Sequence, residues 1–342
     1  MIYGLRVVAV GGGTGLAALL TGLKKFVDPP DSGSLERDSV YFADLAALVT
    51  VTDDGGSSGR LRDELQILPP GDVRNCLLAL SSDESLLSSL FQYRFKGDGG
   101  LGGHNFGNLF LAALTSVTGD FYSAVRAASH VLAIEGRIFP STTQSVSLVA
   151  ELEDGSEVRG ETRISASTKT IRSVRLDPPD CPPLEDSLAA IEEADLILIG
   201  PGSLYTSLIP NLLVPGVVEA ISRSQALVVY LSNIMTQPGE TTGYSVRNHV
   251  DALLTNCPRL ELSFVLANST PVPEPTRERY RSESAEPVTC SPADETALSC
   301  PVLVEDLLGA GEPVRHDGRK TAEALRTLFP QARFETTRRL TK

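Results

Sequence analysis

The chain has 342 residues, of which 42% are hydrophobic and 21% charged, a composition typical of a globular protein with one large α/β domain or two smaller ones. Its formal net charge of −13 excludes a general binder of nucleic acids or anionic membranes, because phosphate-rich surfaces attract basic proteins. Any phosphate binding must therefore come from a local cluster, which Arg60, Arg62 and Arg74 can supply.

Cysteine usage and the N-terminus indicate a cytoplasmic protein. The five cysteines are scattered and include no Cys-x-x-Cys pair, which fits a reducing compartment and disfavours a zinc cluster or a disulfide framework. The first residues lead directly into a glycine loop without a signal-peptide pattern. No uncharged apolar run reaches the ~20 residues needed to cross a bilayer, so we expect no membrane insertion.

The first part of the chain alternates apolar runs with helical patterns. Residues 5–10 and 44–52 have the continuous apolar character of buried parallel strands. Between them we expect a helix over 14–26 and a surface insertion over 28–43, which is rich in proline and acidic residues. Further helices are predicted over 73–91, 105–117 and 120–133.

Residues from about 136 to 176 interrupt this alternation. Apolar side chains alternate from Val146 to Leu152, Asp154 and Gly155 supply a hairpin turn, and the alternation resumes at Val158. This pattern predicts an antiparallel β-hairpin excursion from the main sheet.

After residue 185 the α/β alternation returns. We expect strands over 195–200, 226–231 and 260–267, and helices over 185–194, 214–223 and 244–255. Residues 268–300, rich in Pro, Glu, Ser and Thr, predict an irregular segment, and a last strand and helix precede a basic tail over 331–342. The sequence thus predicts one α/β domain over 1–330, with a Rossmann-like, doubly wound, mostly parallel sheet.

Glycine-rich polar loops follow the predicted strands, where a doubly wound sheet forms its ligand crevice. The first loop, GGGTG, follows a strand and opens a helix, a setting in which backbone N–H groups hold phosphate. It matches neither GxGxxG nor the P-loop, and a tight strand–helix turn is the alternative. Its candidate phosphate-binding residues are Gly11, Gly12, Gly13, Thr14 and Gly15.

The second loop, DDGGSSGR, directly follows the second strand. Asp53 or Asp54 can accept from ribose hydroxyls or hold Mg²⁺ through oxygen, so these two are the candidate catalytic and metal-binding residues. A solvated turn is the alternative, because Asp, Gly and Ser dominate turns. The candidate ligand-binding residues of this loop are Asp54, Gly55, Gly56, Ser57, Ser58 and Arg60.

Two more polar segments open helices. GDVRN and GGHNFGN offer Asp72, Arg74 and Asn75, and His104, Asn105 and Asn108. Helix capping by the aspartate and asparagine residues is the alternative to ligand binding. The four histidines are widely separated, so no zinc site is expected.

The second half of the chain has two comparable loops. Residues 200–207 and 233–240 offer Gly200, Gly202 and Ser203, and Asn233, Thr236 and Gln237. The latter loop is long for a strand–helix connection, which favours a functional role. Nothing in the sequence identifies a catalytic base, because GxSxG, HExxH and kinase signatures are all missing.

Six of these segments, in order, resemble the bacterial gluconeogenesis factor family (YvcK-like), which sits in the superfamily of 2-phospho-L-lactate transferase (CofD-like). The segments are VVAVGGGTGL, VTVTDDGGSSGRLR, ILPPGDVRNCLLAL, GHNFGNLFLAALT, ADLILIGPGSLYTSLIPNLLVPG and MTQPGETTGY. The resemblance runs from about residue 5 to 267 and resumes at RHDGRK. It implies a Rossmann-like fold, a cytoplasmic setting and a nucleotide or UDP-sugar ligand, and it adds Arg315 to the site.

The resemblance also implies a role in growth on gluconeogenic carbon sources and in cell shape through envelope metabolism. It leaves two functions open. One is a UDP-sugar-binding regulator without catalysis, and the other is a transferase that moves a phosphorylated group from a nucleotide diphosphate donor, as the superfamily enzyme does with GDP and Mg²⁺. The dinucleotide-type first loop adds an NAD(P)-binding protein as a third reading. A homodimer is left open, and no protein partner is identified.

Overall fold

The computed structural model describes residues 3–27, 40–82 and 86–340, and for residue 3 and residues 331–340 the backbone only. Most of the insertion predicted over 28–43 therefore lies outside the described residues, and residues 40–43 begin a strand. Within the described ranges, no single helix is long and apolar enough to cross a membrane; one bent pair, Leu204–Leu212 with Val217–Arg223, reaches that length and composition when its halves are joined.

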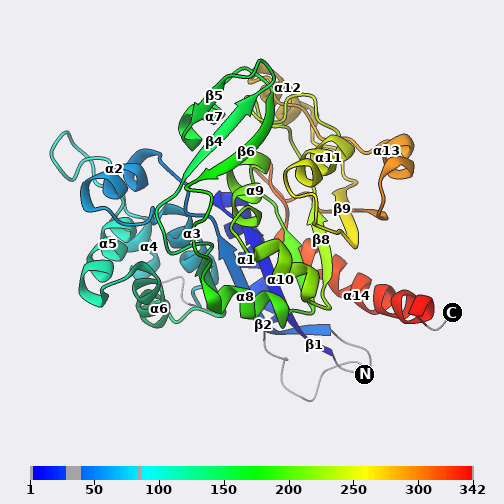
Figure 1. The fold of residues 1–342 in the computed structure, drawn as a ribbon, viewed down its shortest axis with the longest axis horizontal. Coiled ribbons are helices and arrows are strands. Elements are labelled where there is room, and N and C mark those ends of the chain that lie inside the picture. The colour runs from blue at the N-terminus through cyan, green and yellow to red at the C-terminus, as the bar shows by residue number, and fades with distance from the viewer. Residues whose placement is uncertain (1–2, 28–39, 83–85, 341–342) are drawn as a thin grey trace.

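A seven-stranded sheet with every neighbouring pair parallel forms the centre of the molecule (Figure 1). Its strand order is β10-β9-β8-β7-β1-β2-β3. The strands are β1 Tyr3–Gly11, β2 Val40–Val49, β3 Arg137–Pro140, β7 Leu196–Ile199, β8 Leu227–Leu231, β9 Phe264–Asn268 and β10 Val302–Glu305. The predicted doubly wound α/β fold is confirmed, although β3, expected within the excursion, belongs to the main sheet.

Helices cover both faces of this sheet, as the alternation of its side chains dictates. On β1, Val7 and Ala9 pack with Leu16 and Leu19 of α1 (Gly13–Leu23), whereas Val8 and Val10 join the core of the opposite face. The first face is covered further by α3 Gly71–Leu80, α5 Phe106–Thr118, α6 Phe121–Val131 and α14 Gly318–Leu340. The second is covered by α8 Glu185–Glu192, α9 Ile209–Leu212, α10 Val217–Arg223 and α11 Val246–Asn256.

The remaining helices are short. They are α2 Gly56–Leu65, α4 Leu86–Gln92, α7 Glu161–Ser165, α12 Glu274–Ser282 and α13 Pro292–Ala297, with single turns at Lys24–Phe26 and, π-helical, at Leu204–Leu208. The helix predicted over 73–91 is thus two helices, α3 and α4. The irregular segment 268–300 contains α12 and α13, and most of the predicted basic tail continues α14.

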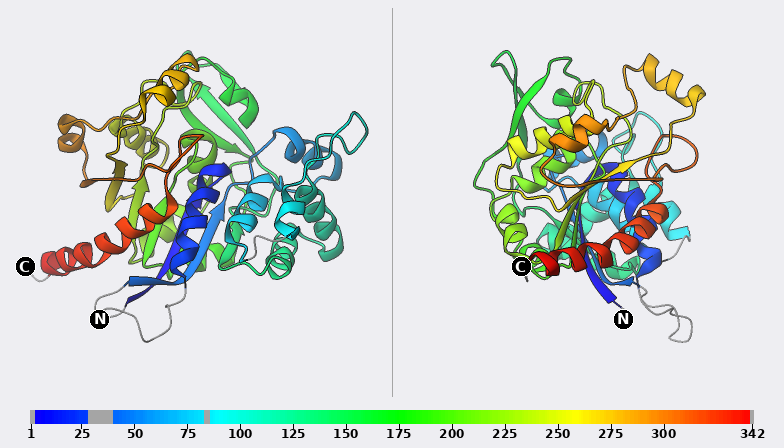
Figure 2. Two further views of the ribbon diagram at one scale, coloured as in Figure 1. Left: turned by 180° about the vertical axis from the view of Figure 1, so that it is seen from behind. Right: turned by 90° about the vertical axis from the view of Figure 1, so that its right-hand side faces the viewer.

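The predicted antiparallel excursion is a three-stranded sheet in the order β5-β4-β6. It consists of β4 Ser147–Leu152, β5 Glu157–Arg159 and β6 Ile171–Asp177, and it carries α7. Together with α12 it stands above the carboxyl ends of the parallel strands (Figure 1), and the quarter-turn view places the two on opposite sides of that end (Figure 2). The excursion and α12 therefore flank the region in which such sheets bind ligands.

The chain reverses its direction of travel across the sheet between β1 and β7. From β1 it proceeds through β2 to β3, and from β7 it proceeds in the other direction through β8 and β9 to β10. The loops that follow β1 and β7 consequently separate to opposite sides and leave a crevice. The last helix, α14, returns to this region and lies against α1, where Gly22 meets the backbone of Gly318.

Candidate functional site

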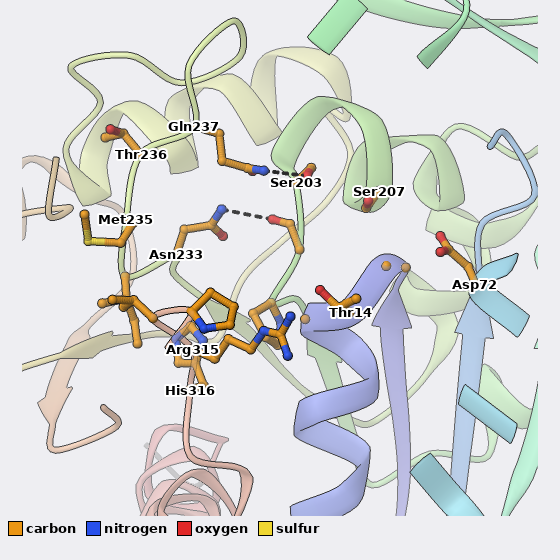
Figure 3. A pocket seen from close by; sticks show the side chains of 18 of the residues that line it. Thr14, Asp72, Ser203, Ser207, Asn233, Met235, Thr236, Gln237, Arg315 and His316 are labelled. Carbon is orange, nitrogen blue, oxygen red and sulfur yellow. Dashed lines mark hydrogen bonds between the residues drawn. The ribbon is translucent and has the colours of Figure 1, made fainter. Parts of the chain in front are cut away.

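A cavity of about 380 Å³ opens at this crevice between β1 and β7 (Figure 3). Eleven of the predicted site residues line it: Gly12, Gly13, Thr14, Gly15, Asp72, Gly202, Ser203, Asn233, Thr236, Gln237 and Arg315. Its volume lies in the range of small-molecule sites, about 300–1,000 Å³. The structure therefore brings together segments that are up to 300 residues apart in the chain.

The glycine loop and the start of α1 form one wall of the cavity. Gly13 has a φ of +63°, and a Cβ atom at Gly12 would lie 2.7 Å from Oδ2 of Asp72. A Cβ at Gly15 would lie 3.1 Å from the carbonyl oxygen of Pro201. The N-cap residue of α1, Gly12, has no side chain to cap the helix, and the Gly13 N–H group donates to the Asp72 carboxylate. The other free N–H groups of this first turn are available to an anion.

The opposite wall carries two side-chain amides from the loop after β8. Asn233 Nδ2 donates to the carbonyl oxygen of Gly202 at 3.0 Å, and Gln237 Nε2 donates to Ser203 Oγ at 2.8 Å (Figure 3). These bonds fix both amides with their oxygens free: Asn233 Oδ1 and Gln237 Oε1 are buried and have no partner among the described residues. Buried acceptors without a donor favour a ligand that carries N–H or O–H groups.

The segment before α14 closes the cavity on a third side. Arg315 is exposed, and within the described chain its side chain makes no ion pair or hydrogen bond; its guanidinium group points toward Thr14 (Figure 3). The neighbouring His316 is buried, and its Nε2 lies 3.0 Å from the carbonyl oxygen of Ser232. Burial lowers the pKa of His316 to about 4, so this histidine is neutral at physiological pH.

Two carboxylates, Asp72 and Glu161, complete the lining. Burial and the charge of Asp53 raise the pKa of Asp72 to about 6, against the opposing effect of the Gly13 N–H group. Burial and the charges of Asp72 and Asp53 raise the pKa of Glu161 to about 9, so Glu161 is protonated at pH 7. Its Oε2 atom is buried without a hydrogen-bond partner in the described part of the chain.

A second group of predicted residues does not line the cavity, and its side chains are hydrogen-bonded mostly to one another; Asn108 Oδ1 is its one buried acceptor without a partner among the described residues. Ser57 Oγ lies 3.1 Å from His104 Nδ1 and accepts from the backbone N–H of Asn105 at 3.3 Å. Asn108 Nδ2 donates to Ser58 Oγ at 3.5 Å. Asn105 caps α5 by accepting from the N–H of Asn108 at 3.2 Å, so its capping alternative is confirmed. We call these five residues the serine–histidine–asparagine network.

The paired aspartates, Asp53 and Asp54, do not line the cavity. Asp53 Oδ1 accepts from the N–H of Gly55 at 2.8 Å, and Asp54 Oδ1 accepts from the N–H and Oγ1 of Thr162 at 2.9 and 2.7 Å. Asp54 thereby fastens α7 of the excursion to the loop after β2. Among the described residues, no group of three or more acidic, histidine or cysteine side chains is arranged to hold a metal ion.

The expected arginine cluster does not form at the cavity. Arg62 Nη2 donates to the carbonyl oxygen of Val146 at 2.7 Å, and Arg74 Nη2 donates to Oδ1 of Asn75 at 2.6 Å. Arg60 is exposed outside the lining. The cation at the cavity is instead Arg315. Four predicted glycines, Gly11, Gly55, Gly56 and Gly200, adjoin the site without lining it.

Sequence reasoning missed several lining residues, among them Glu161, Tyr280 and His316. Glu161 is the first residue of α7 in the excursion, and Tyr280 lies on α12 in the segment expected to be irregular. Neither position carries a glycine-rich or strand-end pattern. For His316, its position directly after Arg315 in RHDGRK was a usable signal.

Comparisons with known proteins agree with this architecture. The family model of 2-phospho-L-lactate transferase CofD matches residues 7–308. The gluconeogenesis factor of Halalkalibacterium halodurans is 46% identical over 321 residues, covering 94% of this chain and 95% of the relative. That of Bacillus subtilis is 44% identical over 327 residues, covering 95% and 98%.

A crystal structure of a Bacillus halodurans protein has a TM-score of 0.88 and 45% sequence identity to this chain, covering 94% of this chain and 99% of that one. The chain therefore belongs to the gluconeogenesis factor family, within the superfamily of the 2-phospho-L-lactate transferase CofD.

Proposed function

We propose that this protein is a cytoplasmic regulator that binds a nucleotide diphosphate compound, a UDP-sugar, in the cavity between β1 and β7. The observation that carries the proposal is the pair of buried, unpartnered amide oxygens, Asn233 Oδ1 and Gln237 Oε1, opposite an uncapped helix N-terminus. One wall suits an anion and the other suits hydrogen-bond donors. A nucleotide sugar carries a diphosphate together with ribose, base and sugar donors, and so satisfies both walls.

The lining residues fit such a ligand part by part. The backbone of Gly12 and Gly15 would hold the diphosphate, because a Cβ atom at either position would obstruct the turn. Arg315 would neutralise the phosphate charge from the side of α14. Asn233 and Gln237 would accept from ribose hydroxyls or a base N–H group.

A regulatory role is supported by the state of the titratable groups at the cavity. His316 is buried, hydrogen-bonded to backbone and neutral, and Glu161 holds a proton at pH 7. Neither side chain is hydrogen-bonded to a hydroxyl or thiol group of the described residues that it could activate. With the relatives named gluconeogenesis factors, we extend the proposal to growth on gluconeogenic carbon sources and to cell shape.

Isothermal titration calorimetry with UDP-N-acetylglucosamine, GDP and NAD tests the ligand class. We expect UDP-N-acetylglucosamine to bind most tightly of the three compounds. Asn233→Ala should lower the affinity for UDP-N-acetylglucosamine by a larger factor than the affinity for GDP or for NAD. Arg223→Gln, which alters an exposed ion pair with Glu192 far from the cavity, is the matched control. Absence of binding by all three compounds at millimolar concentration refutes the proposal, and preference for NAD or GDP transfers it to that ligand.

One observation favours a second function, transfer of a phosphorylated group with Mg²⁺. Asp72 and Glu161 face the cavity, and burial together with neighbouring carboxylates raises the pKa of both, although Arg74 partly opposes the rise at Asp72. With ligand phosphate oxygens, these two would hold Mg²⁺ better than Asp54, which is bound to Thr162. The ion would supply charge neutralisation at the phosphates.

Mass spectrometry distinguishes the transferase from the regulator. Purified protein is incubated with Mg²⁺ and either UDP-sugars or GDP-linked phospholactate with its deazaflavin acceptor. The regulatory proposal expects no turnover. Multiple turnovers that disappear in Asp72→Asn, while the Arg223→Gln control keeps them, establish the transferase instead.

A further inference from the structure

A second cavity, of about 260 Å³, lies beside α12 and outside the site described above. Two of its lining residues, Arg277 and Arg281, are four residues apart on α12 and therefore share one face of that helix. Glu286 and Thr289 add polar groups, and Val272 and Pro287 add apolar surface.

The two arginines are weakly neutralised. Arg277 Nη1 lies 3.6 Å from Glu274 Oε2 in an exposed pair, a geometry that contributes little. The Arg281 side chain makes no ion pair or hydrogen bond with the residues that the structure describes. Two guanidinium groups on one helix face repel each other, and a shared dianion between them relieves that repulsion.

We propose that this cavity is a second small-molecule site that takes a sugar phosphate. The guanidinium groups of Arg277 and Arg281 bind the phosphate. A guanidinium group is planar and can donate two parallel hydrogen bonds to one phosphate group. The Glu286 carboxylate, which would repel a bare anion, accepts hydrogen bonds from sugar hydroxyls together with Thr289. Val272 and Pro287 contact the apolar face of the ring. A volume slightly below that of drug-sized sites, about 300 Å³ and more, suits a monosaccharide phosphate.

Three hydrogen bonds link the lining of this cavity to the lining of the main one. The N–H of Thr236 donates to the carbonyl oxygen of Glu286 at 2.7 Å, and the N–H of Glu286 donates to Thr236 Oγ1 at 2.9 Å. The N–H of Val288 donates to the carbonyl oxygen of Ile234 at 2.8 Å. Thr236 and Ile234 line the first cavity, and Glu286 lines the second. An occupant of the second cavity thus contacts a segment that is hydrogen-bonded to the wall of the first.

Calorimetric titration with glucose 6-phosphate, glucose and inorganic phosphate tests the inference on the full chain. We expect glucose 6-phosphate to bind, inorganic phosphate to bind more weakly, and glucose not to bind. Arg281→Gln and Arg277→Gln should each weaken glucose 6-phosphate by about tenfold or more, the effect of one charged hydrogen bond. Both side chains are exposed, so the variants should fold normally, which thermal unfolding verifies.

Two further variants separate this site from its alternatives. Glu286→Gln should weaken glucose 6-phosphate and leave inorganic phosphate unchanged or tighter, because only the sugar needs the carboxylate. Gly13→Val should leave glucose 6-phosphate binding intact, so that failure of the main cavity cannot mimic failure of this one. Arg223→Gln is again the control. The inference is overturned if glucose 6-phosphate does not bind, if Gly13→Val abolishes its binding, or if inorganic phosphate binds as tightly with the same arginine dependence.

Discussion

Two regions of this molecule have nearly the same residue types but different surroundings. The cavity at the β1/β7 crevice keeps Asn233 Oδ1 and Gln237 Oε1 unpartnered, and Arg315 faces it. In the serine–histidine–asparagine network, Ser57, His104 and Asn105 bind one another instead. Glycine, serine and asparagine therefore do not identify a ligand site by themselves. What distinguishes the cavity is open space: Asn233 and Gln237 carry their free oxygens on the wall of a volume of about 380 Å³, whereas Asn108, whose Oδ1 is also buried and unpartnered in the described chain, does not line it.

The largest effect on ligand affinity is expected from a variant that distorts the glycine loop of the cavity. Gly13→Val places a β-branched residue at a φ of +63° at the first residue of α1. We expect the affinity for UDP-N-acetylglucosamine to fall about 100-fold or more, since the N–H groups of the turn move away from the ligand. Calorimetry measures the affinity and circular dichroism the fold.

Gly119→Val is the control for Gly13→Val, because Gly119 has a φ of +93° at the end of α5, outside the cavity lining. It should lower stability without changing affinity. Unchanged affinity in Gly13→Val would show that the loop glycines serve the turn and not a ligand.

Arg315→Ala tests the cation at the cavity. Loss of a charged hydrogen bond to phosphate should weaken UDP-N-acetylglucosamine binding by about 1.5–3 kcal/mol, or roughly 10- to 100-fold. Arg223→Ala, at an exposed ion pair, should have no effect. If the two variants bind alike, Arg315 is a surface arginine and the phosphates are held by backbone alone.

Glu161→Gln tests the buried acid through pH. The pKa of Glu161 in the folded chain, about 9, lies above its ordinary value of 4.5, so the folded state binds this proton more tightly than the unfolded state. The free energy of unfolding of the parent should therefore fall as pH rises between these values. The amide removes that loss, and we expect Glu161→Gln to be more stable by about 1–3 kcal/mol at pH 8 and nearly equal at pH 5.

Urea denaturation at the two pH values measures the difference for Glu161→Gln. Glu192→Gln, at an exposed pair, is the control and should follow the parent at both. A Glu161→Gln profile parallel to the parent would mean that Glu161 is ionised and paired in the ligand-free protein.

Asn105→Ala tests the serine–histidine–asparagine network. Its side chain caps α5 and donates through Nδ2 to the carbonyl oxygen of Gln92 at 3.1 Å. We expect a loss of about 1–2 kcal/mol of stability and no change in ligand affinity. Thermal unfolding and calorimetry report the two quantities separately. A loss of affinity without a loss of stability would show that the serine–histidine–asparagine network takes part in ligand binding.

Most of the fold could be predicted from the sequence because its signals are local. The apolar runs at β1 and β7, each followed directly by glycine, and that at β8, followed by a long polar loop, predict parallel strands and the loops that end them. The assignment of β3 to the main sheet could not be predicted in this way. Its four residues are too short for a periodicity, and only pairing with β2, about ninety residues earlier, places them.

The site was predictable to the extent that it consists of strand-end loops. Gly12, Ser203 and Asn233 each follow a strand and each line the cavity. The hydrogen-bond partners of the polar side chains could not be predicted, because they depend on contacts between segments that are distant in the sequence. Asp54 is occupied by Thr162 of the excursion, and Arg62 by a carbonyl group of Val146, which removes both from the cavity. Glu161 enters the cavity through the same excursion.

The close contact between α14 and α1 also has a consequence for biosynthesis. A Cβ atom at Gly22 would lie 2.1 Å from the carbonyl carbon of Gly318, so the two helices meet backbone to backbone, three residues beyond Arg315. The glycine loop is synthesised well before Arg315. A nascent chain that lacks α14 has the glycine loop without the docked Arg315. Under the proposed function, such a chain would bind the nucleotide more weakly than the chain with α14 in place, so that products of interrupted synthesis would compete poorly for it.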